Sequence, residues 1–321
     1  MTRYNPAFPA PPMQLLKVRH VTTYRYRQPV AFGEHRMMFR PRDSYDQKLL
    51  EARLLIAPEP VELRWHHDVF GNCVAIARFS GRSKELRFES VIRLDHSPTN
   101  MLDFEIADYA RSYPFSYSAE EMPDLLRSIE RQYLDPERKL DRWARQFLSR
   151  NDRNSSYDLL AAMTQAINTR FAYKARYEAG TQDPLRTLAL GSGTCRDFAL
   201  LMMEAARSLG FAARFVSGYL YSPNRQGHAG GGSTHAWLQV YLPGAGWVEF
   251  DPTNGIVGNR DLIRVAVVRD PRQAVPLSGT WTGFPSDHLG MDVEVGVTEE
   301  HRPAEIEESA IERTSAAEAS A

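Results

Sequence analysis

The chain has very few cysteines, because only Cys73 and Cys195 occur among its 321 residues. A disulfide framework is therefore excluded, and a single bridge between the two would use up both thiols. We expect both cysteines to be free, which is typical of a reducing compartment. The sequence thus predicts a cytoplasmic protein.

The chain also has almost no net charge and no long apolar runs. Its 39 basic and 40 acidic residues leave a formal charge of −1, so no general attraction to nucleic acid or to a membrane surface is expected. No apolar run approaches the roughly 20 residues of a membrane span. Residues 1–12 are rich in proline and contain no apolar stretch typical of a signal peptide. We therefore expect neither a nucleic-acid nor a membrane partner.

The first part of the chain has the alternating pattern of β-strands. Apolar and charged residues alternate from residue 16 to residue 27. Further strands are expected at 49–56, 61–66, 74–79 and 86–94. Short strands separated by turn residues favour an antiparallel sandwich. The sequence therefore predicts a β-rich domain at 15–98, after a flexible N-terminus at 1–14.

The pattern changes after residue 100. Helical spacing of apolar residues appears at 120–132, 138–149, 157–170 and 195–209, and strands are expected at 212–221, 235–242 and 246–251. We expect this α+β domain to extend over 99–298. Residues 299–321 are rich in Glu, Ala and Ser and are expected to be a disordered acidic tail.

Cys195 lies at the predicted start of a helix. Gly193 and Thr194 precede it, and Asp197 follows at the position of a capping box. Unpaired amides and the positive end of the helix dipole favour the thiolate form of a cysteine at such a position. The sequence therefore predicts a nucleophile at Cys195, with Gly193 and Thr194 as residues of the surrounding cleft.

His235 and Asp251 are predicted to lie on one face of a β-hairpin. A three-residue loop at 243–245 would pair Leu242 with Gly246 and place Trp237 opposite Asp251. His235 is then the diagonal neighbour of Asp251, within side-chain reach. A loop of even length would put the two side chains on opposite faces. This register predicts a His–Asp pair.

These three residues suit acyl-transfer chemistry. Cys195 would attack a carbonyl carbon, His235 would act as its base, and Asp251 would orient the imidazole. The amide of Cys195 could stabilise the oxyanion together with a second donor, for which Tyr173 and Trp237 are candidates. Trp247 could be core or cleft wall.

Six segments resemble the bacterial transglutaminase-like family of the papain-like cysteine superfamily. They are 20–26 and 33–36 in the β-rich part, then 191–198, 212–220, 234–237 and 246–253. The resemblance implies a papain-like α+β core and a catalytic triad at Cys195, His235 and Asp251. It also implies a peptide or protein substrate with an amide acyl donor, a primary amine as a possible acceptor, and no cofactor. It does not choose between transfer, proteolysis and deamidation.

Two other functions remain open from the sequence. One is a catalytically idle module that binds a peptide or protein in the same cleft. The other is a metal site in which His228 joins the three residues of the triad, although no metal-binding signature is present. His66 and His67 could also bind a metal, but a solvated or packed pair at a strand end is the simpler interpretation. Oligomeric state and natural substrate are not predicted.

Overall fold

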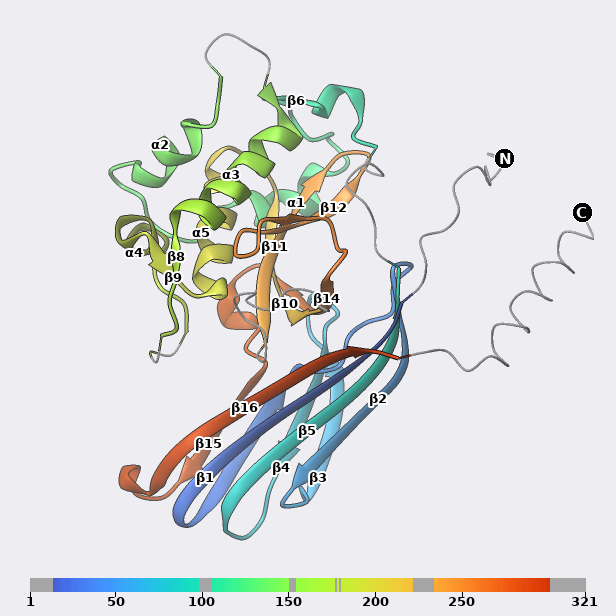
Figure 1. Cartoon of the computed structure of the whole chain (residues 1–321), viewed down its shortest axis with the longest axis vertical. Helices are drawn as coiled ribbons and strands as arrows, with labels where there is room; N and C mark the ends of the chain where they lie inside the picture. The colour runs from blue at the N-terminus through green and yellow to red at the C-terminus, as the bar shows by residue number, and fades with distance from the viewer. Residues whose placement is uncertain are drawn as a thin grey trace, which may run out of the picture.

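A computed structural model describes residues 14–97, 105–149, 154–176, 178, 180–221 and 234–300. It has an elongated β-rich part and a mixed part in which the helices gather at one end of the strands (Figure 1). The predicted α+β class is confirmed. Most of the expected flexible N-terminus, His228 and nearly all of the expected tail lie outside the described residues.

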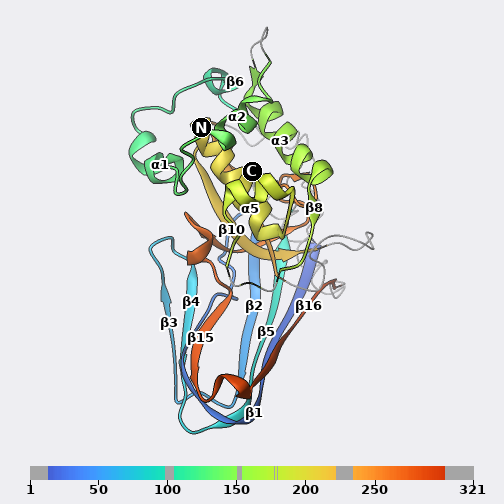
Figure 2. The same cartoon turned by 90° about the vertical axis from the view of Figure 1, so that its left-hand side faces the viewer.

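The β-rich part is a sandwich whose two layers share one long strand. Its strands are β1 (Gln14–Met37), β2 (Gln47–Ala57), β3 (Glu62–His67), β4 (Cys73–Arg78), β5 (Ser83–His96), β15 (Leu277–Thr282) and β16 (His288–Glu299). The first half of β1 pairs with β5 and β16, and its second half pairs with β4 and β15. Figure 2 shows the two layers that result, with β3, β4 and β15 facing β2, β5 and β16.

Aromatic and aliphatic side chains from both layers fill the sandwich. Phe88 and Leu86 of β5 are fully buried against Met37 and Val30 of β1. In β5, Leu86 and Phe88 alternate with exposed or half-buried polar residues, which is the pattern that a two-layer β-structure requires. The predicted antiparallel sandwich is therefore present.

The predicted second domain, 99–298, differs from the structure at its C-terminal end. The sequence assigned 99–298 to one catalytic unit, yet β15 and β16 return to the first sheets and pair with β1. Arg25 and Asp292 form an ion pair across this contact. Val293, Val295 and Val297 alternate with polar residues in β16, so the strand signal was present, but the partner of a strand cannot be read from local pattern.

The second part of the chain contains the helices and an antiparallel sheet. Its helices are α1 (Met122–Ile129), α2 (Lys139–Arg145), α3 (Ser156–Arg170), α4 (Pro184–Leu190) and α5 (Cys195–Ser208), with 3-10 turns η2 (Asp108–Ala110) and η3 (Pro271–Gln273). A further 3-10 turn, η4 (Pro285–Asp287), joins β15 to β16 in the sandwich. Its main strands are β10 (Ala213–Leu220), β11 (His235–Leu242), β12 (Gly246–Asp251), β13 (Ile256–Val257) and β14 (Leu262–Val268), in the order β13-β12-β11-β10-β14. Short pairs join β6 (Ser112–Tyr113) to β7 (Asn154–Ser155) and β8 (Ala172–Tyr173) to β9 (Ser192–Gly193). None of the helices in this described part is long and apolar enough to cross a membrane.

Helix α5 is the centre of this part of the fold. It packs on β10 and β11, and α2, α3 and α4 cover its other side (Figure 1). Phe198, Leu201, Met202 and Ala205 are buried along it, as their helical spacing predicts. The core therefore holds the helix that carries Cys195 from all sides.

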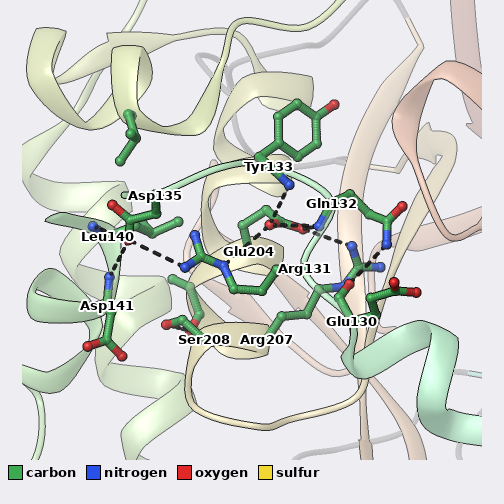
Figure 3. A network of polar contacts seen from close by, with 12 residues as sticks. Glu130, Arg131, Gln132, Tyr133, Asp135, Leu140, Asp141, Glu204, Arg207 and Ser208 are labelled. Atoms are coloured by element: carbon green, nitrogen blue, oxygen red, sulfur yellow. Dashed lines mark hydrogen bonds and ion pairs between the residues drawn. The ribbon is translucent and has the colours of Figure 1, made fainter. Parts of the chain in front are cut away.

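A buried ion pair fixes the second half of α5. The carboxylate of Glu204 accepts a 2.9 Å hydrogen bond from Arg207, and longer bonds from the backbone amides of Gln132 and Tyr133 (Figure 3). Both charged side chains are fully buried. Glu204 thereby anchors the segment between α1 and α2 to the central helix.

The sandwich packs against the second sheet at its β10 and β14 edge; the outer face of this sheet is the one away from α5. Leu16 and Ile92 of the sandwich contact Tyr219 of β10 and Ile263 of β14. The Tyr219 hydroxyl also lies 3.0 Å from Nδ1 of His20, and burial lowers the pKa of His20 to about 4. The two parts therefore share an apolar contact in which His20 is neutral at neutral pH.

Gly218 lies where β10 and β14 approach each other closely. A Cβ atom at this position would lie 2.0 Å from the carbonyl oxygen of Ile263 and 2.8 Å from the Trp237 ring. We expect Gly218→Ala to lower the free energy of unfolding by about 2 kcal/mol or more, because backbone atoms would have to move. Gly296→Ala in β16, with nothing within 4 Å, is the matched control in urea denaturation. Equal stability of the two variants would contradict this account of the contact.

Candidate active site

Cys195 is the first residue of α5. Thr194 is the N-cap, and its backbone amide donates a 2.8 Å hydrogen bond to the Asp197 carboxylate. Gly193 is buried, and a Cβ atom there would lie 2.8 Å from the Cβ of Asp197. The glycine and the cap that precede the cysteine thus allow the chain to turn tightly into the helix. The cysteine itself is 6% exposed, so its thiol is nearly covered.

Asp197 ties the start of α5 to the preceding loop. Its buried carboxylate accepts hydrogen bonds from Arg176 at 2.8 and 3.0 Å and from the backbone amide of Gln182 at 2.6 Å. Burial would raise the pKa of Asp197, but these donors and Thr194 outweigh it and lower the pKa. The sequence suggested only a helix cap here, and Arg176 and Gln182 gave no recognisable signal.

The structure brings His235 and Asp251 together. The predicted register is confirmed, since Leu242 pairs with Gly246 and Leu238 with Phe250. Nε2 of His235 lies 2.8 Å from Oδ2 of Asp251, and both side chains are fully buried. The hairpin thus fixes which ring nitrogen faces the carboxylate.

Asn254 completes this arrangement and was missed by the sequence reasoning. Its side-chain amide donates a 2.8 Å hydrogen bond to the same oxygen of Asp251 that faces His235. The other carboxylate oxygen accepts the backbone amide of Thr253 at 2.9 Å. Burial would raise the pKa of Asp251, but the His235 charge and these hydrogen bonds lower it. The turn after β12 therefore holds the carboxylate ionised.

The other nitrogen of His235 is available to the thiol. Nδ1 is buried and has no hydrogen-bond partner within the described residues. Burial alone would lower the pKa of His235, but the Asp251 carboxylate and the neighbouring Cys195 raise it to about 10. Cys195 is thus close enough to interact with the imidazole, without a fully formed hydrogen bond. The arrangement favours an imidazolium beside the thiol.

The raised pKa of His235 has a consequence for stability. A group whose pKa is raised on folding contributes stability that is complete below its ordinary value of 6.5 and is lost as the pH rises through about 10. We expect wild type to lose stability relative to Asp251→Asn between pH 7 and pH 10.5, because the variant lacks the charged pair at every pH. Urea denaturation of both proteins at a series of pH values measures this difference. A difference that is constant across this range would contradict a charged His235.

The remaining predicted cleft residues lie in different places. Tyr173 pairs with Gly193 across β8 and β9 and is 40% exposed. Partial burial raises the pKa of Tyr173 to about 12, and the charge of Cys195 and a hydrogen bond to it act in the same direction. Tyr173 therefore lies beside the thiol.

The two tryptophans do not flank the thiol in this way. Trp237 is fully buried with Val216 and Leu262 on the outer face of the sheet, and its ring stacks on His235 at 5.9 Å between centroids. Trp247 lies four residues from Asp251 along β12, about 13 Å away, beneath the guanidinium of Arg214. Strand parity predicted the correct sheet face for both tryptophans. It did not predict how far each tryptophan lies from the thiol along that face.

Within the described residues no group of three or more His, Cys, Asp or Glu could hold a metal ion. His228, which the alternative metal site required, lies outside the described residues. His66 and His67 occupy the edge strand β3, where Nε2 of His67 lies 3.7 Å from the Cys73 sulfur. The part of the chain that the structure describes thus offers a thiol, an imidazole and a carboxylate as its chemical groups at this site.

A central helix that begins with a cysteine, packed on a sheet that carries a His–Asp pair, defines the class of papain-like cysteine folds. Family comparison agrees and is more specific. Residues 141–252 match the transglutaminase-like superfamily, and residues 16–95 match the bacterial transglutaminase-like N-terminal region. The resemblance inferred from the sequence motifs is confirmed.

Similar proteins cover almost the whole chain. Uncharacterized proteins of Mycobacterium bovis and Mycobacterium tuberculosis are each 27% identical over 305 residues, which is 88% of this chain and 91% of theirs. A solved structure of a proposed cysteine protease from Cytophaga hutchinsonii superposes with a TM-score of 0.65 and 19% identity, over 91% of this chain and 93% of that one. At this identity the likeness establishes the fold alone.

Proposed function

We propose that the protein is a cysteine-dependent enzyme that cleaves or transfers the acyl group of an amide through a thioester on Cys195. The observation that carries the proposal is the buried 2.8 Å contact between His235 and Asp251, which leaves Nδ1 of the imidazole free beside the thiol. A carboxylate in this position holds one tautomer and stabilises the imidazolium. The resemblance to transglutaminase-like proteins supports the same chemistry.

The reaction would proceed in two steps. The Cys195 sulfur would bond to the amide carbonyl carbon, and the proton held by His235 would pass to the departing amine as the C–N bond breaks. Water or a primary amine would then attack the thioester, giving its proton to His235 as the C–S bond breaks. The thiolate and the imidazolium are restored at the end of the cycle.

The negative charge of the tetrahedral intermediate needs at least two donors. The amide of Cys195 belongs to the first turn of α5, where backbone amides lack intrahelical partners. The Tyr173 hydroxyl is the second donor in this proposal, because Tyr173 is the candidate that interacts with Cys195. Trp237 is not used, since its ring packs under His235.

The substrate class proposed is a peptide or protein with a glutamine side chain or a susceptible peptide bond. A panel of glutamine-containing peptides, with and without an added primary amine, tests the proposal. Ammonia release indicates deamidation, incorporation of the amine indicates transfer, and new chain termini indicate proteolysis. Absence of all three products across the panel, at an enzyme concentration equal to that of the peptide, would count against an acyl-transfer enzyme.

One observation favours a second candidate, a catalytically idle module that binds a peptide or protein. Cys195 is only 6% exposed, and a nucleophile must reach its substrate. Peptides from the panel that bind wild type and Cys195→Ala equally, without turnover by wild type, would support the binding module. Turnover by wild type would exclude it.

A further inference from the structure

A cavity of about 620 Å³ lies between the sandwich and the outer face of the second sheet. Residues 42–47, which lead into β2, form one wall, and the hairpin of β11 and β12 forms another. Arg214, Gln239 and Arg264 face it from β10, β11 and β14. It lies on the side of the sheet opposite to α5, with Trp237 between it and His235 on β11.

Most charged groups in the cavity are already paired. Arg264 forms ion pairs with Asp46 and with Glu249, at 2.6 Å for the latter. Gln239 donates a 2.7 Å hydrogen bond to the same oxygen of Glu249. Asn259 adds a further donor to Asp46. Both carboxylates therefore already accept hydrogen bonds from groups of the protein.

Arg214, which is half-buried, is the exception. Its Nε donates a 2.7 Å hydrogen bond to Gln239, and its guanidinium lies 3.9 Å from the Trp247 ring centroid. Within the described residues its two terminal nitrogens have no hydrogen-bond partner and it forms no ion pair. Burial lowers the pKa of Arg214 to about 9, although Glu249 opposes this shift. A half-buried guanidinium without a counter-ion attracts an anion.

A second unpaired guanidinium stands at the mouth of the cavity. Arg42 is exposed and donates to the carbonyl oxygen of Phe70 at 3.1 Å, and it forms no ion pair within the described residues. The charge of Arg42 is close enough to lower the pKa of Arg214. Two carboxylates, Asp43 and Glu105, also lie on the exposed rim. Because these two carboxylates repel an anion, they favour a ligand small enough to bind at Arg214 without contacting Asp43 or Glu105.

We propose that this cavity binds a small ligand through a carboxylate group held by Arg214. The planar fork of a guanidinium matches the two oxygens of a carboxylate, which would accept from the free terminal nitrogens. Arg42 would attract the ligand at the entrance. The site is separate from Cys195 and does not depend on the proposed enzymatic function.

Calorimetric titration of the full chain with succinate tests the proposal. Succinamide, its uncharged analogue, and inorganic phosphate are titrated in parallel at constant ionic strength. Arg214→Met removes the fork but keeps much of the stem, and Arg42→Gln removes the charge at the mouth. Arg27→Gln is the matched control, because Arg27 is exposed, lies outside the cavity and forms no ion pair with any residue that the structure describes.

We expect saturable binding of succinate and none of succinamide. Arg214→Met should weaken binding about tenfold or more, since charged hydrogen bonds are lost, Arg42→Gln should weaken it less, and Arg27→Gln should leave it unchanged. A melting curve of each variant establishes that it is folded. Absence of succinate binding by wild type, equal binding by Arg214→Met, or a clear preference for phosphate would each overturn the proposed carboxylate site.

Discussion

Cys195→Ser is expected to lower the turnover rate of any amide that the wild-type protein cleaves by about 1,000-fold or more. A serine hydroxyl at this position keeps the shape of the side chain but is far harder to deprotonate than a thiol. His235, which Asp251 holds protonated in the resting site, is not available to take the serine proton. Removal of the nucleophile leaves only the modest catalysis that binding and the oxyanion donors supply. Product release from the best peptide of the panel, at equal concentrations of the two proteins, measures the loss.

Cys73→Ser is the matched control for this experiment. Cys73 begins β4 in the sandwich and lies beside His67, so it too has an imidazole neighbour. We expect its substitution to leave turnover within a factor of about two, since no part of the proposed chemistry uses it. If Cys195→Ser retained the wild-type rate, the thioester would be excluded whatever the effect at Cys73.

Glu204→Gln is expected to lower the free energy of unfolding by about 3 kcal/mol. The substitution keeps an oxygen acceptor but leaves Arg207 buried without its counter-ion (Figure 3). A buried charge that loses its partner is costly because it has left water and gains nothing in return. Urea denaturation followed by circular dichroism measures the change.

Glu137→Gln is the control for the buried ion pair. Glu137 pairs with Lys139 at 3.0 Å, but its side chain is 68% exposed. Exposed pairs contribute little, so we expect a change within about 0.5 kcal/mol. Similar losses for both variants would show that burial of Glu204 is not what makes its ion pair important.

Local features of this fold could be predicted from its sequence. The capped helix at Cys195 follows from Thr194 and the apolar stripe behind it, and the register of β11 with β12 follows from the parity of a three-residue loop. Both depend on residues close together in the chain. The His–Asp contact at the site could be predicted for this reason.

Features that depend on distant segments could not be predicted. The return of β15 and β16 to the first sheets depends on pairing with residues 240 or more positions earlier. Arg176 reaches Asp197 from a loop without regular structure, and Asn254 differs from any other turn asparagine only through the orientation of that turn. The cavity at Arg214 likewise requires both parts of the chain.

Alkylation of Cys195 tests the central claim most directly. Limiting iodoacetamide is added to wild type and to His235→Asn at pH 6, and the adducts on Cys195 and Cys73 are quantified by peptide mass spectrometry. Cys73 is the more exposed of the two thiols, so exposure alone favours it. We predict that Cys195 reacts faster than Cys73 in wild type and loses this advantage in His235→Asn. Preferential labelling of Cys73 in wild type, or labelling of Cys195 that does not depend on His235, would contradict an activated thiolate.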